Sequence, residues 1–348
     1  MELDHPVVPV DRDILHAIDA VWASLAEPGR WLTGAQRVAV AHECRTAADG
    51  RRGTSSVLTD HHRDLVAYVV HDPAGIQDVA LPDLLGPAMS VDEYVELCAV
   101  AAKVVAIDRF CTGLGASLLP LPSPRPGEPG RRRPPAAADH GARVPMLDPE
   151  ALAAEIGPGT YHVNVRRGHS LVPEEADLQI RLVEALYVPD LLAHGLAGRR
   201  GLDRAQIEAV ATRVSTLNRC FYCSAGHAAL LTMAAGEGSG DAVAGAAAGG
   251  GDGHGVEHGP QLFALVEALV QGRPPLEAAR AAAAEVLTDE QLLGAIATTC
   301  AFLLLNRVSD TSGIPLDPMG AAVLADLPPE LGLGDLPGAA RTTDAPAP

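Results

Sequence analysis

Apolar residues recur at helical spacing in the stretch DRAQIEAVATRVSTL, residues 203–217. They follow intervals of three and four positions, and so lie on one helical face: Ile207, Val210, Ala211, Val214 and Leu217. Asp203 stands before the apolar positions as an N-cap, and its charge suits the positive end of the helix dipole. The pattern predicts an amphipathic helix that follows Asp203.

The stretch TDEQLLGAIATTCAFLLLNRV, residues 288–308, is apolar on nearly every face and has Thr288 as its predicted cap. Its run IATTCAFLLL is shorter than the ~18–20 residues that a membrane span needs, so we expect a central, buried helix. The stretches HHRDLVAYVVHD and QLFALVEALVQG predict two shorter helices at 61–72 and 261–272.

Composition supports an all-α fold. Of 348 residues, 47% are hydrophobic but only 3% are aromatic, so Ala, Leu and Val must fill the interior. A β-sandwich would favour more aromatic and β-branched residues, whereas closely packed helices accept small ones. We therefore expect an all-α protein.

Three blocks of the sequence occur twice, in the same order and at nearly constant spacing. LTGAQRVAVA from Leu32 and LDRAQIEAVA from Leu202 are identical at six of ten positions. DLVAYVVHDP from Asp64 aligns with ALVEALVQGR from Ala264, and the stretch from Ser90 aligns with the one from Thr288. In this last pair Arg109 corresponds to Arg307, and Gly115 corresponds to Gly313. The blocks predict a helical unit that is present twice.

Two low-complexity segments divide the chain. A Pro-rich linker at 119–146, unsuited to helix or strand, separates a first repeat at 1–118 from a second unit at 147–332. Within the second unit, residues 236–259 are rich in Gly and Ala and predict a flexible loop. Residues 333–348 predict a disordered tail.

Charge and cysteine content restrict the class of function. The formal net charge of −18 repels phosphate backbones and anionic lipid, so we expect no nucleic-acid or membrane partner. The opening residues MELDHPVVPVDRD do not resemble a signal peptide. Four cysteines stand alone in apolar surroundings and do not form a disulfide framework: Cys44, Cys98, Cys111 and Cys300. We expect a cytoplasmic protein.

The stretch LNRCFYCSAGH, residues 217–227, carries the candidate chemistry. On a helix, Cys220, Cys223 and His227 fall on one face and can touch one another. With Asn218 as the predicted N-cap, Cys220 lies in the first turn, where the helix dipole and a nearby histidine favour thiolate. Two thiols at this spacing can close into a disulfide, which is the chemistry of peroxide reduction or dithiol exchange.

Glu208 joins this group only if the chain turns between the two stretches. On one unbroken helix it would lie about 18 Å from Cys220, too far for proton transfer. A turn near Leu217–Arg219 would bring two antiparallel helices together and align Glu208 with His227. We therefore predict a turn there, and a Glu208–His227–Cys223 relay.

The spacing E-(x)11-C-F-Y-C-S-A-G-H resembles the active-site signature of the AhpD-like alkylhydroperoxidases, in the carboxymuconolactone decarboxylase superfamily. The later stretch LLLNRVSDTSG resembles the closing helix of that unit. The resemblance covers about 160–318 well, and 5–118 as a degenerate copy. It implies an all-α, homo-oligomeric peroxidase or dithiol oxidoreductase that needs no cofactor or metal. It also implies a hydroperoxide or disulfide substrate, and a dihydrolipoyl protein or a small thiol as reductant.

The resemblance also implies catalytic roles for individual residues. Cys223 would attack the peroxide, Cys220 would close the disulfide, and His227 with Glu208 would relay the proton. Where AhpD itself has a further histidine, this chain has Tyr222, which we interpret as a wall residue. The first repeat retains none of the four site residues, and the positions that align with them are Val38, Gly50, Gly53 and Val57. We expect one active centre per chain, with the first repeat supplying packing surface.

Other interpretations of the cysteine pair stay open. Two thiolates and an imidazole are three of the four ligands of a zinc site, with a fourth from His254, His258 or Glu208. An acid–base enzyme like the decarboxylases of the superfamily would use His and Glu without the thiols. A redox sensor would oxidise once per chain without turnover, and simple packing of the pair in a core is the remaining alternative.

Overall fold

A computed structural model gives the fold, and its described residues are 3–188, 195–236, 239–247, 253, 255–272, 275–318, 321, 324–325 and 327–342. Regular structure in this part of the chain is helical, as predicted. The α-helices are α1 (Arg12–Ala26), α2 (Gly34–Ala48), α3 (Asp60–His71), α4 (Leu81–Leu85), α5 (Val91–Gly113), α6 (Pro149–Ile156), α7 (Asn164–Arg167), α8 (Pro173–Leu186), α10 (Arg204–Leu217), α11 (Phe221–Ala235), α12 (Ser239–Ala247), α13 (Gly259–Gln271), α14 (Leu276–Ala284) and α15 (Asp289–Ser312). Short 3₁₀ helices are η1 (Pro73–Asp78), η2 (Pro329–Leu331), η3 (Leu333–Asp335) and η4 (Ala339–Thr342).

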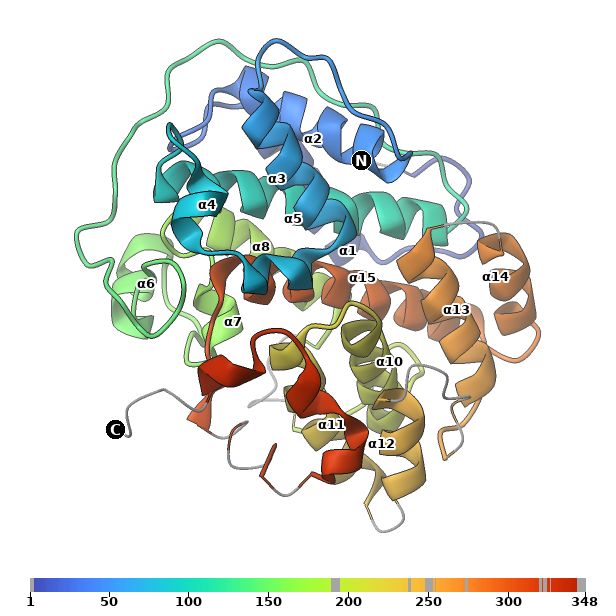
Figure 1. The fold of residues 1–348 in the computed structure, drawn as a ribbon. Coiled ribbons are helices and arrows are strands. Elements are labelled where there is room, and N and C mark those ends of the chain that lie inside the picture. The colour runs from blue at the N-terminus through green and yellow to red at the C-terminus, as the bar shows by residue number, and fades with distance from the viewer. Residues whose placement is uncertain are drawn as a thin grey trace.

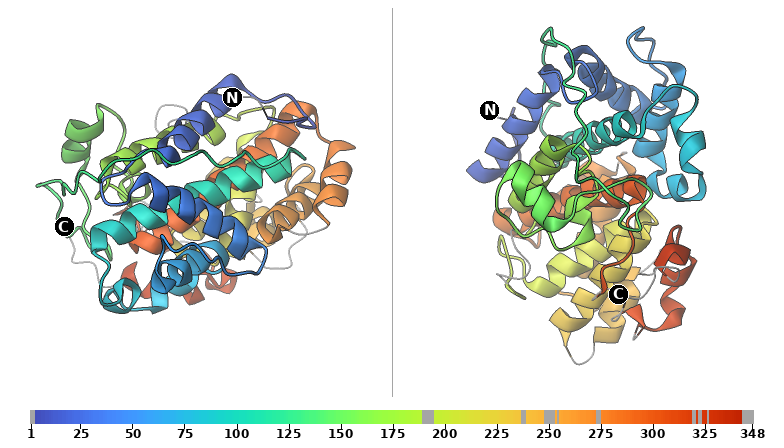
Figure 2. Two further views of the ribbon diagram at one scale, coloured as in Figure 1. Left: turned by 90° about the horizontal axis from the view of Figure 1, so that it is seen from above. Right: turned by 90° about the vertical axis from the view of Figure 1, so that its left-hand side faces the viewer.

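Helices α5 and α15 pack against each other across the middle of the molecule (Figure 1). Helices α2 and α3 lie on one side of this pair, and α10, α11 and α12 lie on the other; Figure 2 shows the same layers from two further sides. Every residue of α15 from Leu292 to Ser312 is buried, so the predicted central helix is confirmed. By length and composition alone α15 could cross a membrane, but its apolar window is entirely buried inside the protein.

Polar caps begin the helices where the sequence placed them. The predicted caps Asp203 and Thr288 each accept a hydrogen bond from the backbone N–H three residues on, and each forms a reciprocal capping box. Thr33 and Ser90 do the same for α2 and α5, which carry the matched blocks of the first segment. The matched blocks therefore fall on α2 and α10, α3 and α13, and α5 and α15, whereas the duplication itself stays a prediction.

The two predicted units share one hydrophobic core, which includes residues from Val8 to Leu333. A buried charge network also connects them. Arg37 of α2 lies 2.6 Å from a carboxylate oxygen of Glu96 and 2.6 Å from one of Glu175, and Lys103 lies 2.6 Å from the other oxygen of Glu175. Since Glu175 belongs to α8 and the other three to α2 and α5, the network joins the segments on either side of the linker.

The linker at 119–146 contains no helix, in keeping with its proline content, and its backbone is tied to the first segment. The N–H of Arg125 donates to the carbonyl of Ala26 at 2.7 Å, and the indole of Trp22 donates to the carbonyl of Pro120 at 2.8 Å. The domain boundaries drawn at this linker stay a prediction.

Two segments differ from the predictions. Residues 236–259 include helix α12, because alanine favours helix and Ala242, Val243 and Ala246 can pack against α10 and α11. Within the predicted tail, residues 333–342 form two 3₁₀ turns and Leu333 is buried; residues 343–348 lie outside the described part of the chain.

We expect the substitution Arg37→Met to lower the free energy of unfolding by about 3–5 kcal/mol at pH 7, because two buried carboxylates would lose their shared cation. In the native protein, burial alone would raise the pKa of Glu175. The positive charges of Arg37 and Lys103 outweigh this effect and hold that pKa at about 2. The stability that Glu175 contributes is therefore present above its unfolded pKa and lost as pH falls through about 2.

In the variant, this loss of stability should occur at higher pH, since a proton then neutralises the carboxylate more easily. Urea unfolding at pH 7 and pH 5 measures both effects. The control is Arg181→Met, at an exposed arginine on α8. Equal stability of the variant and the native protein at pH 7 would rule out this role for Arg37.

Candidate functional site

A three-residue turn brings the candidate site together. Helix α10 ends at Leu217 and α11 begins at Phe221, and Arg219 between them has a left-handed backbone with φ of 57°. The N–H of Cys220 donates to the carbonyl of Ser215 at 2.9 Å and closes the turn. Helices α10 and α11 therefore pack side by side, and the predicted turn is confirmed (Figure 1).

The predicted cap of this turn is wrong. Asn218 is the C-cap of α10, and Cys220 is the N-cap of α11, because the left-handed residue Arg219 separates them. The side chain of Asn218 instead donates to Oδ1 of Asn306 at 2.8 Å. As a result, it is Cys223 that lies in the first turn of α11.

Glu208 and His227 meet across the two helices. His227 Nδ1 lies 2.6 Å from Glu208 Oε2. The other carboxylate oxygen, Oε1, accepts from the Tyr187 hydroxyl at 2.5 Å and from Arg204 Nε at 2.6 Å. Both oxygens of this fully buried carboxylate are thus satisfied by donors.

The electrostatics of this contact keep the carboxylate charged. Burial alone would raise the pKa of Glu208, but the charges and hydrogen bonds of His227 and Arg204 outweigh it and hold the pKa below its ordinary value. An ionised Glu208 accepts from His227 Nδ1, which leaves Nε2 as the nitrogen that can exchange a proton elsewhere.

Aromatic rings fix the plane of the imidazole. The ring of Phe302 on α15 lies edge-to-face with His227 at 4.4 Å between centroids, and the ring of Tyr187 does so at 6.0 Å. The histidine side chain keeps 16% of its surface exposed, so the relay is almost enclosed by protein.

The two cysteines share one hydroxyl. Ser309 Oγ on α15 lies 2.9 Å from Cys220 Sγ and 3.7 Å from Cys223 Sγ. Both cysteines are free thiols, and both are buried. Since His227 stands four residues after Cys223 on α11, its side chain neighbours Cys223 on the same helical face.

The thiol of Cys220 has an unfavourable environment for charge. Burial and the neighbouring Cys223 raise the pKa of Cys220 well above its ordinary value, although Ser309 acts in the opposite direction. Cys220 is therefore held as a neutral thiol.

Asp310 is a site residue that the sequence analysis missed. It is 1% exposed, contacts the Cys220 thiol, and has one carboxyl oxygen, Oδ2, without a hydrogen-bond partner among the described residues. Burial, followed by the contact with Cys220, raises the pKa of Asp310 well above its ordinary value, while Gln77 of η1 lowers it. A carboxyl group that readily holds a proton thus lies beside the thiol.

Four further residues of the site lacked a strong sequence signal. Arg204 could have been found from its i, i+4 spacing to Glu208. The others lie far from the cysteines in sequence, and only folding brings them near: Tyr187, Phe302 and Ser309.

Tyr222 does not face the thiols with its hydroxyl. It donates to Asp317 Oδ2 and accepts from the N–H of Val165 at 3.3 Å. Next to it, Phe221 and Ala225 pack with Leu316 of the C-terminal segment. The wall beside the cysteine pair is therefore made partly by residues that follow α15.

Asn306 and Arg307 make structural contacts near the core. Asn306 donates to Ser215 Oγ at 3.0 Å and accepts from Asn218. Arg307 donates to the carbonyls of Val69, Val70 and Leu303, each at 2.8 Å. Asn306 thereby holds the turn of the site, while Arg307 ties α15 to the end of α3.

Within the described ranges, no group of three or more His, Cys, Asp and Glu side chains is arranged to hold a metal ion. Of the fourth ligands considered for zinc, His258 is the N-cap of α13 and Glu208 is bound to His227 and Arg204. His254 lies outside the described residues.

Comparison with known proteins gives one match. Residues 184–251 match the family model of the carboxymuconolactone decarboxylase family. This segment contains Tyr187, Arg204, Glu208, both site cysteines and His227. No curated protein and no solved structure matches the chain significantly. Within this all-α chain, the segment around the cysteine pair, residues 184–251, is thus similar to the carboxymuconolactone decarboxylase family.

Proposed function

We propose that the protein is a thiol-dependent peroxidase or dithiol–disulfide oxidoreductase, with Cys223 and Cys220 as its redox pair. One observation carries the proposal: both sulfurs lie against the Ser309 hydroxyl, and Cys223 stands one helical turn before a histidine that is hydrogen-bonded to a buried carboxylate. Packing alone would not need an ion-paired Glu208 at this place, since a buried charge is costly.

In the first step, His227 Nε2 accepts the Cys223 proton and the resulting thiolate attacks the terminal oxygen of a hydroperoxide. The O–O bond breaks, Cys223 becomes a sulfenic acid, and the departing alkoxide takes the proton back from His227. Glu208 stabilises the imidazolium that exists between these two proton transfers.

In the second step, Cys220 attacks the sulfur of the Cys223 sulfenic acid, and hydroxide must leave. The protonated Asp310 gives its proton to this hydroxide, so that water departs, and takes up the proton of Cys220 as the disulfide forms. An external dithiol then reduces the disulfide by exchange and is itself oxidised. We propose a dihydrolipoyl protein or a small thiol as that reductant, in a cytoplasmic homo-oligomer.

A second candidate is an acid–base enzyme that uses Glu208 and His227 alone. The observation that favours it is that Glu208 and His227 are already joined with Nε2 of the imidazole unclaimed by Glu208, an arrangement that also suits proton abstraction from a small metabolite. In this case the cysteines would take no part in the reaction, and their oxidation would not be a step of turnover.

The main test is intact-mass spectrometry of the native protein, with thiol alkylation, before and after one equivalent of hydroperoxide. We expect a loss of two hydrogens that maps to Cys220–Cys223 and is reversed by a dithiol. Catalytic consumption of peroxide with the reductant separates an enzyme from a sensor that oxidises once. Bound zinc, with thiols that resist alkylation, would instead establish a metal site.

Two cysteine variants test which sulfur attacks the peroxide and which one closes the disulfide. Cys223→Ser should abolish peroxide turnover, whereas Cys220→Ser should accumulate a sulfenic acid at Cys223 that dimedone traps. The matched control is Cys44→Ala, at a buried cysteine of α2. Full activity of either site variant would refute the assignment.

We expect Glu208→Gln to shift thiolate formation at Cys223 to higher pH, because a neutral amide stabilises the imidazolium less than a carboxylate does. Thiolate absorbance at 240 nm against pH measures this shift, and circular dichroism reports whether the helices persist. The exposed Glu285→Gln is the control. An unchanged titration would remove Glu208 from the relay.

We expect Asp310→Asn to slow disulfide closure by about 100-fold, since an amide cannot carry the proton between thiol and hydroxide. The initial reaction of Cys223 with peroxide should be nearly unaffected, so the sulfenic acid should live longer. Asp289→Asn, at the exposed start of the same helix, is the control. If the variant forms the disulfide with the native rate and pH profile, Asp310 has a packing role and does not transfer a proton.

A further inference from the structure

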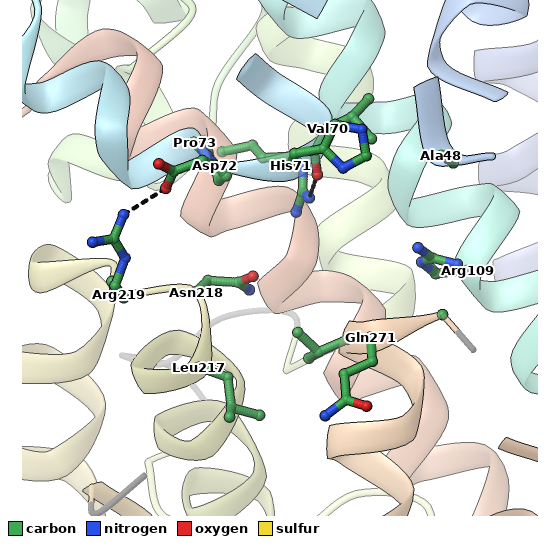
Figure 3. A pocket seen from close by; sticks show the side chains of 13 residues that line it. Ala48, Val70, His71, Asp72, Pro73, Arg109, Leu217, Asn218, Arg219 and Gln271 are labelled. Carbon is green, nitrogen blue, oxygen red and sulfur yellow. Dashed lines mark hydrogen bonds and ion pairs between the residues drawn. The ribbon is translucent and has the colours of Figure 1, made fainter. Parts of the chain in front are cut away.

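A separate cavity of about 300 Å³ lies where the ends of several helices meet. Figure 3 shows Arg109 on one side of it and Asn218 with Arg219 on the other. The lining comes from both predicted units, mainly through Val70, Asp72, Arg109, Leu217, Val270 and Arg307. Arg109 and Arg307 are the two residues that correspond in the aligned blocks, so each central helix contributes an arginine to one cavity.

The arginines that line the cavity differ in whether their guanidinium groups have hydrogen-bond or ion-pair partners. Arg307 donates to the carbonyls of Val69 and Val70 at the end of α3. Arg219 forms an ion pair with Asp72 at 2.6 Å. For the Arg109 guanidinium, by contrast, the described part of the chain offers no hydrogen bond or ion pair, and the neighbouring carboxylate of Asp108 is bound to Arg45.

Arg109 is also partly removed from solvent. Burial lowers its pKa below the ordinary value, and the opposing effects of Cys300 and Asp108 do not restore it. A cation that loses hydration without gaining a partner is unfavourable, so an acceptor in the cavity would be bound with a net gain.

The dipoles of the helices that end at the cavity provide an alternative reason for an arginine at this place. Helices α3, α10 and α13 all end at the cavity, and their terminal carbonyls attract cations. Arg307 satisfies the carbonyls of α3 in this way. Arg109 lies against Gly272, where a Cβ would come within 1.9 Å of its Nη1, yet it makes no hydrogen bond to a described carbonyl of α13. Its donors therefore stay available to a ligand.

From these contacts we propose that the cavity binds a small organic monocarboxylate, whose carboxylate pairs with Arg109 and whose aliphatic part lies against Val70 and Val270. Arg109 is the lining arginine whose guanidinium has no hydrogen bond or ion pair among the described residues, and this single guanidinium matches a ligand with one carboxylate. The valines, together with Leu217, suit an aliphatic chain, whereas the net charge of −18 opposes a multiply charged anion such as phosphate. This site is distinct from the thiols and goes beyond the proposed redox function.

The experiment is calorimetric titration of the full-length reduced protein with hexanoate at low ionic strength, with hexanamide and inorganic phosphate as comparison probes. Hexanoate should bind at one site per chain, and at least tenfold more tightly than hexanamide, which has the same chain but no charge. Arg109→Gln should weaken hexanoate binding by tenfold or more, and Arg109→Lys should retain part of it because the charge persists. Arg181→Gln, at an exposed arginine of α8, should bind as the native protein does.

Several results would overturn the proposal. They are absence of hexanoate binding, equal binding of hexanoate and hexanamide, tighter binding of phosphate, and undiminished binding to folded Arg109→Gln. If that variant does not fold, the comparison of the two hexanoyl probes on native protein still decides the question. Because none of these readouts depends on thiol oxidation, a failure here is distinguishable from a failure of the redox proposal.

Discussion

The buried carboxylate of Glu208 is the constraint around which the candidate site is built. A charge that is fully removed from water is tolerated only if donors replace its hydration, and three side chains do so: Arg204, Tyr187 and His227. To deliver them, α10 must turn back into α11 after Leu217, and residue 187 must approach from the end of α8. The same arrangement that stabilises the charge fixes the Nδ1 side of the imidazole against Glu208.

Helix α15 provides the opposite wall, and nearly every contact with the site comes from its second half. Phe302 packs on the imidazole, Asn306 holds the turn, Ser309 touches both sulfurs and Asp310 lies beside Cys220. Asn306 follows Phe302 by four residues, and Ser309 and Asp310 follow Asn306 by three and four, so a single helix sets their spacing.

The first segment of the chain supports the site indirectly. Its η1 residue Gln77 acts on Asp310, and the hydroxyl of Tyr94 on α5 donates to the carbonyl of Thr311 at 2.8 Å. Both contacts reach the second half of α15, and Gln77 adds a polar contribution that the aligned blocks did not indicate.

Local chemistry made part of this structure predictable. Periodic apolar residues with a polar cap identified α10 and α15, and the distance between Glu208 and Cys220 required a turn, because the alternative was a straight helix too long for contact. The cap Asn218 was misplaced because a left-handed Arg219 has no sequence signature of its own. Helix α12 was missed because a Gly/Ala composition conceals the residues that pack. Ser309 and Asp310 could not be identified at all, since their importance depends on long-range packing of α15 against the turn.

The environments of the two thiols differ enough to divide their roles. Cys220 lies at the helix cap among Ser309, Asp310 and Cys223, where burial keeps it protonated, and Cys223 lies one turn before an imidazole whose far nitrogen is fixed by an anion. In the proposed reaction, these different surroundings let identical groups act in sequence, one as nucleophile and the other as the thiol that closes the disulfide. For the proposed reaction a neutral Cys220 has an advantage, because an unprotonated sulfur beside Cys223 would repel the thiolate that the proposal places there.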